Sequence, residues 1–359
     1  MKIAILSGDG IGPEVMKEAL KILDKVSQIH DLNFTTTEGL IGGAAWDEHK
    51  NHFPEKTKKL CEQSDAVLFG SVGGPIQDQS NPKWNDCEKN SILNLRKSLN
   101  LTVNLRPVKV YKQLEKLCPL KSKIIQKGID IMCIRELSGD VYFGEHKTEI
   151  INGQRIASDN MAYDEETIGY IARKSFEIAK KRKQKLTSVD KANVLDCSKL
   201  WRTVVNEVHQ EFPDCDLEHI LVDNLAMQII KRPSDFDTIL MPNLFGDIIS
   251  DEASVFCGSL GMLPSASFNK NGFGLYEPAG GSAPDIAGQN IANPIAQILC
   301  VALMLENSFY EYKAANNIYQ AIEKTLNEGI FTKDIASNNT ESVPTNIMGD
   351  FIIKNLTVN

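Results

Sequence analysis

Three arginines occur in similar local surroundings, each among apolar residues. Arg96 ends the run Ile-Leu-Asn-Leu-Arg, Arg106 lies in Asn-Leu-Arg-Pro, and Arg135 lies in Ile-Arg-Glu-Leu. A guanidinium in such surroundings must find an anion, because an unpaired buried charge costs several kcal/mol. Each arginine alone is consistent with an ion pair to a protein carboxylate. Three together favour a small ligand that carries two or more carboxylates.

Two aspartates, Asp247 and Asp251, lie four residues apart in a segment with helical periodicity, which places both carboxylates on one helix face. Like charges at this spacing repel, and the apolar neighbours Phe245 and Ile248 indicate that the segment is partly buried. Two interpretations stay open. The pair is either two solvated aspartates or a set of oxygen ligands for Mg²⁺ or Mn²⁺, to which Asp223 would add a third carboxylate.

Two further side chains are candidates for proton transfer. Lys191 lies in a strand-like, mostly apolar run. Desolvation and nearby cations would lower its pKa and make it a general base, whereas an ion pair with the neighbouring Asp190 is the alternative. Tyr142, in Gly-Asp-Val-Tyr-Phe-Gly, is either an ordinary hairpin aromatic or a proton donor at a developing carbanion.

Two glycine-rich segments predict different things. Ser7–Glu14 has glycines at alternate positions, unlike the G-x-G-x-x-G of a dinucleotide-binding turn, so it predicts a tight strand-to-helix turn whose amides could still meet a ligand. Residues 280–288 are too rich in small residues for a packed element and predict a loop that lets backbone approach a ligand closely. If this loop holds a dinucleotide, Asp285 would accept hydrogen bonds from a ribose diol and repel a 2′-phosphate, which favours NAD over NADP.

Strand-like and helix-like runs alternate along much of the chain, which is typical of an α/β protein. The clearest runs are Lys2–Leu6, Glu14–Ile29, Leu32–Thr37, Glu55–Gln63 and Ala66–Gly70. From about residue 101 to 156 the pattern changes to extended segments, Val141–Phe143 among them, joined by turns such as Asn152-Gly153, and predicts a hairpin or arm. The apolar window Ile291–Leu305 is interrupted by polar residues and predicts a buried helix rather than a membrane span.

The composition is that of an ordinary globular protein. Its 359 residues predict about two domains, and 42% apolar with 24% charged residues disfavours disorder. A formal charge of −8 has the wrong sign for a surface that binds nucleic acid or anionic lipid, and the basic run 180–185 is better explained as a solvated helix end. Eight scattered cysteines and the lack of a secretory pattern after Met1 predict a cytoplasmic protein.

Taken together, the chain resembles the β-decarboxylating dehydrogenases, most closely their isopropylmalate branch. The motifs that carry the resemblance run in order as Gly8–Glu14, Val72–Pro75, Asn104–Pro107, Arg135–Leu137, Tyr142–Gly144, Asp190–Asn193, Asn243–Ala253 and Gly281–Pro294. The resemblance implies NAD-dependent oxidative decarboxylation of (2R,3S)-3-isopropylmalate to 4-methyl-2-oxopentanoate and CO₂, a step of leucine biosynthesis. D-malate or tartrate, homoisocitrate and isocitrate remain alternative substrates. A non-catalytic regulatory subunit is the alternative from a different class.

The resemblance also implies a fold that the glycine pattern does not. It implies two α/β domains that bind NAD without the usual Rossmann domain. Residues 1–101 with 258–359 would form a discontinuous NAD-binding domain, and residues 102–257 the dimerisation and metal–substrate domain, with an arm near 141–156. The partners expected are a small 2-hydroxy dicarboxylic acid and a second copy of the chain, with neither nucleic acid nor membrane.

Residue roles follow from the same resemblance. Family arginines at Arg96, Arg106 and Arg135 bind the malate carboxylates, and Ile92 and Leu93 match the apolar pair around the isopropyl group. The family aspartates at Asp247 and Asp251, with Asp223 of the partner subunit, bind one Mg²⁺ or Mn²⁺ per active site, and Asp223 also contacts substrate. Lys191, also from the partner subunit, removes the hydroxyl proton, and Tyr142 assists the final protonation. The NAD contacts implied are Gly74, Glu88, Gly281, Ser282, Ala283, Pro284, Asp285, Ile286 and Asn293.

A few positions depart from the family pattern. Asp140 stands where a glycine is usual beside the tyrosine, and Ser7 where a proline is usual. Residues 76–81 look like an insertion in the segment Gly73–Glu88, which would line the nicotinamide side. None of these departures removes a catalytic group.

Overall fold

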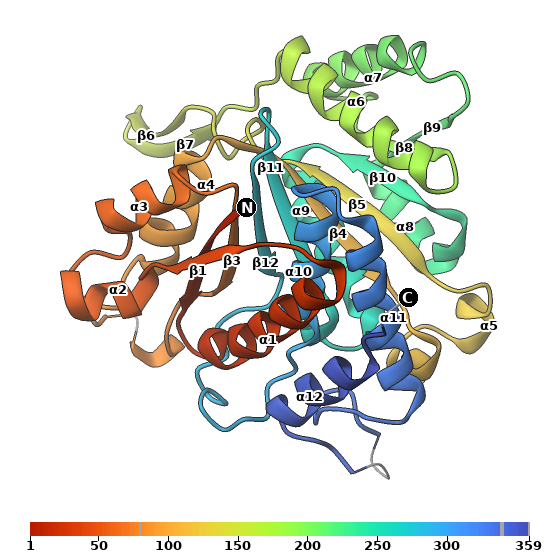
Figure 1. Cartoon of the computed structure of the whole chain (residues 1–359). Coiled ribbons are helices and arrows are strands. Elements are labelled where there is room, and N and C mark those ends of the chain that lie inside the picture. The colour runs from red at the N-terminus through yellow and green to blue at the C-terminus, as the bar shows by residue number, and fades with distance from the viewer. Residues whose placement is uncertain (79, 338–340, 358–359) are drawn as a thin grey trace. The chain divides into compact units, whose positions relative to one another are not determined.

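The computed structural model describes residues 1–78, 80–337 and 341–357. Position 79 of the predicted insertion at 76–81 and the predicted domain end at 359 lie outside the described residues. The chain divides into two compact units, whose helices and strands are drawn in Figure 1. The first unit, discontinuous in sequence, comprises Met1–Leu101, Tyr111–Leu117 and Cys257–Asn359. The second comprises Thr102–Val110 and Cys118–Phe256.

Five strands in the first unit follow the order β2-β1-β3-β12-β11. They are β1 (Lys2–Gly8), β2 (Thr35–Glu38), β3 (Ala66–Ser71), β11 (Pro264–Asn269) and β12 (Gly274–Pro278). Only β11 runs antiparallel to its neighbour β12, and the other pairs are parallel. All six residues of β3 are buried, because a central parallel strand is covered on both faces and its sequence is accordingly a continuous run of apolar and small residues.

The helices of the first unit bury one face each, except for the helix Ile295–Asn307, which is buried on nearly all sides. They are α1 (Gly12–His30), α2 (Gly42–His49), α3 (Glu55–Glu62), α4 (Asn94–Ser98), α10 (Ile295–Asn307), α11 (Tyr312–Asn327) and α12 (Thr345–Asn355). Every residue of α10 from Ile295 to Leu305 is buried, which confirms the predicted buried helix. It begins after Pro294, where Asn293 accepts a hydrogen bond from the Ile295 amide at 3.0 Å.

The second unit contains the strands β4-β5-β10-β8-β9 in that order. They are β4 (Leu101–Lys109), β5 (Asp130–Glu136), β8 (Lys185–Asp190), β9 (Asp216–Leu221) and β10 (Thr238–Met241). Strand β4 is antiparallel to β5, and the remaining pairs are parallel. The helices are α5 (Ser122–Ile125), α6 (Glu165–Lys181), α7 (Asp196–His209), α8 (Val222–Lys231) and α9 (Asn243–Ser254).

A two-stranded hairpin of the second unit confirms the predicted arm. Strands β6 (His146–Ile151) and β7 (Gln154–Asp159) pair antiparallel and every residue in them is exposed. The turn residues Asn152 and Gly153 have positive φ angles of 51° and 76°, as a two-residue hairpin turn requires. The prediction of an extended Val141–Phe143 was wrong, because Asp140 adopts a φ of 75° and the chain turns there.

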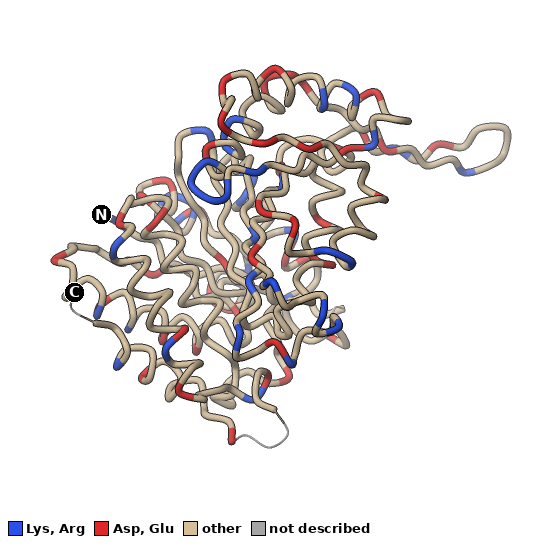
Figure 2. Tube along the Cα trace, turned by 90° about the vertical axis from the view of Figure 1, so that its right-hand side faces the viewer, with Lys and Arg blue, Asp and Glu red and all other residues tan. Residues whose placement is uncertain are grey.

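The basic run near residue 182 ends helix α6, as expected. Arg182 pairs with Asp130 at 2.8 Å and with Asp237 at 3.0 Å, and Lys180 and Lys181 form the last turn of the helix. Basic and acidic residues are both distributed over the described chain (Figure 2). No helix within the described ranges combines the length and apolarity needed to cross a membrane.

Candidate active site

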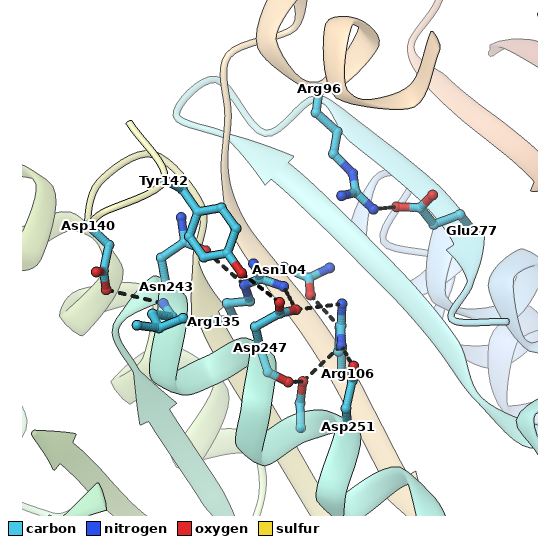
Figure 3. A network of polar contacts seen from close by, with 12 residues as sticks. Arg96, Asn104, Arg106, Arg135, Asp140, Tyr142, Asn243, Asp247, Asp251 and Glu277 are labelled. Carbon is cyan, nitrogen blue, oxygen red and sulfur yellow. Dashed lines mark hydrogen bonds and ion pairs between the residues drawn. The ribbon is translucent and has the colours of Figure 1, made fainter. Parts of the chain in front are cut away.

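Two strands and one helix of the second unit bring an arginine–aspartate cluster together (Figure 3). Arg106 lies on β4 and Arg135 on β5, and the antiparallel register aligns Arg106 with Cys133. Helix α9 places Asp247 and Asp251 next to these strands. The helix approaches β5 closely at a glycine, since a Cβ on Gly246 would lie 2.8 Å from Cγ of Arg135.

Each arginine of this cluster has an aspartate partner. Arg135 forms a short ion pair with Asp247, and its Nε donates to Oδ1 of Asn243 at 2.9 Å. Arg106 donates from Nη1 to Oδ1 of Asp251 at 2.6 Å, and its Nη2 lies 3.8 Å from Oδ1 of Asp247. The aspartates are therefore not simply two solvated side chains, because they neutralise two arginines.

The carboxylates are more accessible than the arginines. The Arg135 side chain is 9% exposed and the Arg106 side chain 19%, whereas Asp247 is 32% and Asp251 71% exposed. A planar guanidinium with a fixed fork of donors matches a carboxylate in shape, so both arginines are suited to bind an acid. The accessible oxygens of Asp247 and Asp251 are suited to a hard divalent cation.

Tyr142 joins the same cluster. Its hydroxyl donates to Oδ2 of Asp247 at 2.9 Å, and the Arg135 guanidinium lies 5.5 Å from the centroid of its ring. Partial burial and the Asp247 carboxylate raise the pKa of Tyr142 above its ordinary value of 10.0. The hydroxyl therefore stays protonated near neutral pH, as a proton donor must.

Lys191 and Asp223 form a separate pair within the second unit. Nζ of Lys191 lies 2.5 Å from Oδ1 of Asp223. Lys191 follows directly after the end of β8, and Asp223 lies in the first turn of α8. The ammonium lowers the pKa of Asp223 by donating to it. The alternative pairing of Lys191 with Asp190 does not occur, because Asp190 is fully buried and accepts from Arg202 at 2.8 Å.

The three aspartates expected as metal ligands are not assembled by one chain. Among the residues that the structure describes, no three His, Cys, Asp or Glu side chains gather closely enough to hold a metal ion. Asp223 pairs with Lys191, while Asp247 and Asp251 belong to the arginine cluster. Within the described residues of one chain, these three aspartates therefore form no common site.

Arg96 has its own partner in the first unit. Its Nη2 donates to Oε1 of Glu277 on β12 at 2.5 Å. The π-helical turn Lys89–Leu93 precedes α4 and carries the predicted apolar pair. Leu93 is 50% exposed, but Ile92 is buried, so only Leu93 presents its side chain at the surface.

A cavity of about 360 Å³ lies within the first unit beside the small-residue loop. Its lining includes four of the predicted NAD contacts, namely Gly281, Ala283, Ile286 and Asn293. The other five predicted contacts are outside the lining, namely Gly74, Glu88, Ser282, Pro284 and Asp285. Gly74 is instead covered by Trp84, since a Cβ there would lie 2.2 Å from the indole.

The glycine-rich turn after β1 holds the small-residue loop in place. The Ile11 amide donates to the Ser282 carbonyl at 2.8 Å, and a Cβ on Gly10 would lie 1.9 Å from that same oxygen. Gly10 has a φ of 59°, a conformation that glycine adopts without strain. The turn therefore has a structural role, and the Ile11 amide is already used by the protein.

Comparison with known proteins decides the family. The model of the isocitrate/isopropylmalate dehydrogenase family matches residues 2–352. The chain belongs to this family. It is 54% identical over 357 residues to 3-isopropylmalate dehydrogenase of Thermotoga maritima, with 99% of each chain covered. It is 52% identical to that of Salmonella typhimurium, with 98% of this chain and 97% of the relative covered.

Solved structures of this dehydrogenase family share the fold. Isocitrate dehydrogenase from Methylococcus capsulatus matches with a TM-score of 0.84 at 28% identity, covering 99% of both chains. A β-decarboxylating dehydrogenase from Thermococcus kodakarensis matches with a TM-score of 0.80 at 33% identity, covering 99% of this chain and 96% of that one. The predicted family and fold class are both confirmed.

Two residues near the candidate sites were not predicted from the sequence. Glu277 pairs with Arg96 across 181 positions of sequence. Asp334 lines the cavity and accepts from Asn293 at 3.1 Å. Neither has a motif around it, and only the tertiary contact identifies them. A compensating carboxylate was expected for each arginine in general, but nothing in the sequence distinguished Glu277 from the other acidic residues.

Proposed function

We propose that this chain is a 3-isopropylmalate dehydrogenase, which oxidises and decarboxylates (2R,3S)-3-isopropylmalate to 4-methyl-2-oxopentanoate and CO₂ with NAD, in leucine biosynthesis. The relatives named above carry that activity in their names and cover this chain almost completely. The observation that carries the proposal is the cluster of Arg106, Arg135, Asp247, Asp251 and Tyr142, which joins two carboxylate binders, two cation ligands and a proton donor.

Substrate binding follows from an exchange of partners within this cluster. The substrate carboxylates would replace Asp247 and Asp251 at Arg135 and Arg106, with equally charged and equally planar groups. The two aspartates would then lack a positive partner, which is costly in a partly buried site. A divalent cation restores the balance, so acid and cation should strengthen each other's binding.

The donor set of this chain fits such a cation. Asp247 and Asp251 supply oxygen ligands only, which suits Mg²⁺ or Mn²⁺, and one ion per active site is proposed with Asp223 of the partner subunit as the third ligand. When bound, the ion would polarise the substrate hydroxyl and carboxylate and stabilise negative charge on the oxygen during decarboxylation. In this proposal two copies share each active site.

The small-residue loop and its cavity fit the dinucleotide. We assign NAD binding to the loop residues 281–286 with Asn293, and the nicotinamide side to Glu88 rather than to Gly74, which Trp84 covers. The cavity has the concave and largely apolar lining of a cofactor site, and Asp285 on the exposed loop would disfavour a 2′-phosphate. NAD would accept the hydride from C2 of the substrate.

Two side chains would move the protons. Lys191 of the partner subunit would take the proton from the C2 hydroxyl as the hydride leaves C2. The bond from C3 to the β-carboxylate then breaks, CO₂ leaves, and the electron pair of that bond stays on the substrate as an enolate. Tyr142 would donate the proton that C3 needs, consistent with its raised pKa.

The remaining assignments concern substrate choice and location. Arg96 would bind one carboxylate. The exposed Leu93 and the buried Ile92 would form the apolar site for the isopropyl group, where one methylene is worth about 1 to 3 kcal/mol. All eight cysteines lie within the described residues and are free thiols, seven of them buried, which fits a reducing compartment such as the cytoplasm.

The direct test is NADH formation by the purified protein with Mg²⁺, comparing 3-isopropylmalate, isocitrate, D-malate and homoisocitrate, each with and without a chelator. We expect chelator-sensitive turnover led by 3-isopropylmalate. A lead by another of these acids would retain the chemistry and refute the substrate. Folded protein that is silent with all four acids would instead support a regulatory subunit.

A further inference from the structure

The loop that carries Tyr142 is attached to helix α9 at two points. The Tyr142 hydroxyl donates to Asp247, and two residues earlier Oδ2 of Asp140 accepts from the Leu244 amide at 3.1 Å. Leu244 lies in the first turn of α9, about one turn before Asp247. Asp140, Tyr142 and Asp247 are labelled in Figure 3. The two contacts together fix the loop along the helix axis.

Asp140 occupies its position despite an unfavourable backbone conformation. Its φ of 75° lies in the region that glycine prefers, and the residue is only 1% exposed. A buried aspartate in this conformation must gain compensating contacts. It has them: besides the Leu244 amide, Asp140 accepts from its neighbour Val141 at 2.7 Å and from the Tyr163 hydroxyl at 3.3 Å.

Helix α9 depends on this contact because it has no cap of its own. The residue before the helix is Pro242, which offers no side-chain acceptor. The first two amides go elsewhere: Asn243 donates to the Tyr163 hydroxyl at 2.9 Å, and Leu244 to Asp140. A carboxylate at the positive end of the helix is also favourable electrostatically. Asp140 therefore acts as an N-cap supplied by a distant part of the chain.

The other end of the loop is fixed as well. Glu136, at the end of β5, is fully buried and accepts from the Ser138 amide at 2.5 Å, the Gly139 amide at 2.8 Å and the Tyr163 hydroxyl at 3.1 Å. The chain is thus held from Glu136 to Asp140, and Tyr142 follows two residues later. Asp140 is the last anchor before the proton donor.

We propose that Asp140 is a positioning residue that fixes Tyr142 against Asp247 by joining its loop to the start of helix α9. The proposal rests on the proposed function, in which Tyr142 supplies the final proton. Asp140 itself touches no reacting atom. Its effect on turnover should therefore pass through Tyr142, and this separates positioning from a general contribution to stability.

The test compares Asp140→Gly, Asp140→Asn and Tyr142→Phe in steady-state assays with 3-isopropylmalate, NAD and Mg²⁺. Glycine suits the backbone at this position and removes all three hydrogen bonds of the side chain, so Asp140→Gly should fold but lower kcat about tenfold, with both KM values within about a factor of two. Asp140→Asn keeps an oxygen for the Leu244 amide and should recover most of that loss.

A double variant gives the sharper result. If Asp140 acts through Tyr142, adding Asp140→Gly to Tyr142→Phe should lower kcat by no more than about a factor of two further, because the interaction is already lost. Hydrogen exchange at the Leu244 amide should be faster in Asp140→Gly. Ile171→Val, which removes a buried methyl group from helix α6 in the same unit, is the control and should change neither kcat nor that exchange rate.

The outcomes that overturn the proposal are distinct. Positioning through Tyr142 would be refuted if the two kcat losses multiplied fully in the double variant. It would also be refuted by wild-type kcat in Asp140→Gly, or by an Asp140→Asn variant as slow as Asp140→Gly. Lack of turnover by the folded wild-type protein would refute the proposed function instead.

Discussion

At the scale of single residues, the site is a set of exchangeable ion pairs. Arg135 and Arg106 are held by Asp247 and Asp251, and Lys191 by Asp223. Pairing orients these side chains, and the aspartates at the two arginines are carboxylates like the substrate groups that we propose to replace them. A carboxylic acid can replace an aspartate at an arginine with little change in geometry. Such a site can select an acid without reorganising its strands.

Lys191 provides the first prediction at this scale. Lys191→Ala should abolish turnover, because no other group is assigned to take the hydroxyl proton, and should leave NAD affinity within about a factor of two. Kinetics and NAD titration of the purified variant measure both. Lys199→Ala is a matched control, since it breaks an exposed lysine–aspartate pair of similar length, 2.7 Å to Asp196. Retained turnover in Lys191→Ala would refute its role as base.

At the scale of elements, features that depend on neighbouring residues were predicted correctly, whereas a turn that depends on contacts between distant segments was not. Helix α10, the β6–β7 hairpin and the shared helix face of Asp247 and Asp251 follow from periodicity and turn residues, which depend on near neighbours. Val141–Phe143 was predicted as extended because its residue types favour strands. The turn there depends on Asp140, whose contacts with Leu244 and Tyr163 are long-range.

For the site, too, spacing along the sequence was predictable but contacts between distant residues were not. The i,i+4 spacing of the aspartates is readable from sequence, but the pairing of Arg96 with Glu277 and of Lys191 with Asp223 requires the tertiary fold. The glycine-rich turn was predicted as a strand-to-helix turn and is one. Its contact with the Ser282 carbonyl joins segments that no local rule connects.

That contact gives the prediction at the element scale. Gly10→Ala should raise the KM for NAD at least about tenfold, because its Cβ would lie 1.9 Å from the Ser282 oxygen and must displace the small-residue loop. Gly329→Ala, in the same unit, is the matched control: its φ is also positive, 78°, but a Cβ there meets nothing within 4 Å. It should lower the melting temperature slightly and leave NAD kinetics unchanged. Equal NAD kinetics in both variants would show that the loop does not bind the cofactor.

At the scale of the whole molecule, the proposed active site needs two copies of the chain. One copy holds Arg106, Arg135, Asp247 and Asp251 together, and pairs Lys191 with Asp223 elsewhere in the same unit. The described residues of one chain form no three-ligand metal cluster. In the proposal the second copy supplies Lys191 and Asp223 to each site.

The most direct test of this account is complementation between two inactive variants. Lys191→Ala and Asp247→Asn should each be inactive alone with 3-isopropylmalate, NAD and Mg²⁺. When equal amounts of the two variants are unfolded together and refolded, half of the dimers should be mixed, and each mixed dimer should contain one intact site. Activity should therefore return to about a quarter of that of refolded wild type. No recovery, with mixed dimers demonstrated by mass spectrometry and refolded wild type active, would contradict a site shared between two copies.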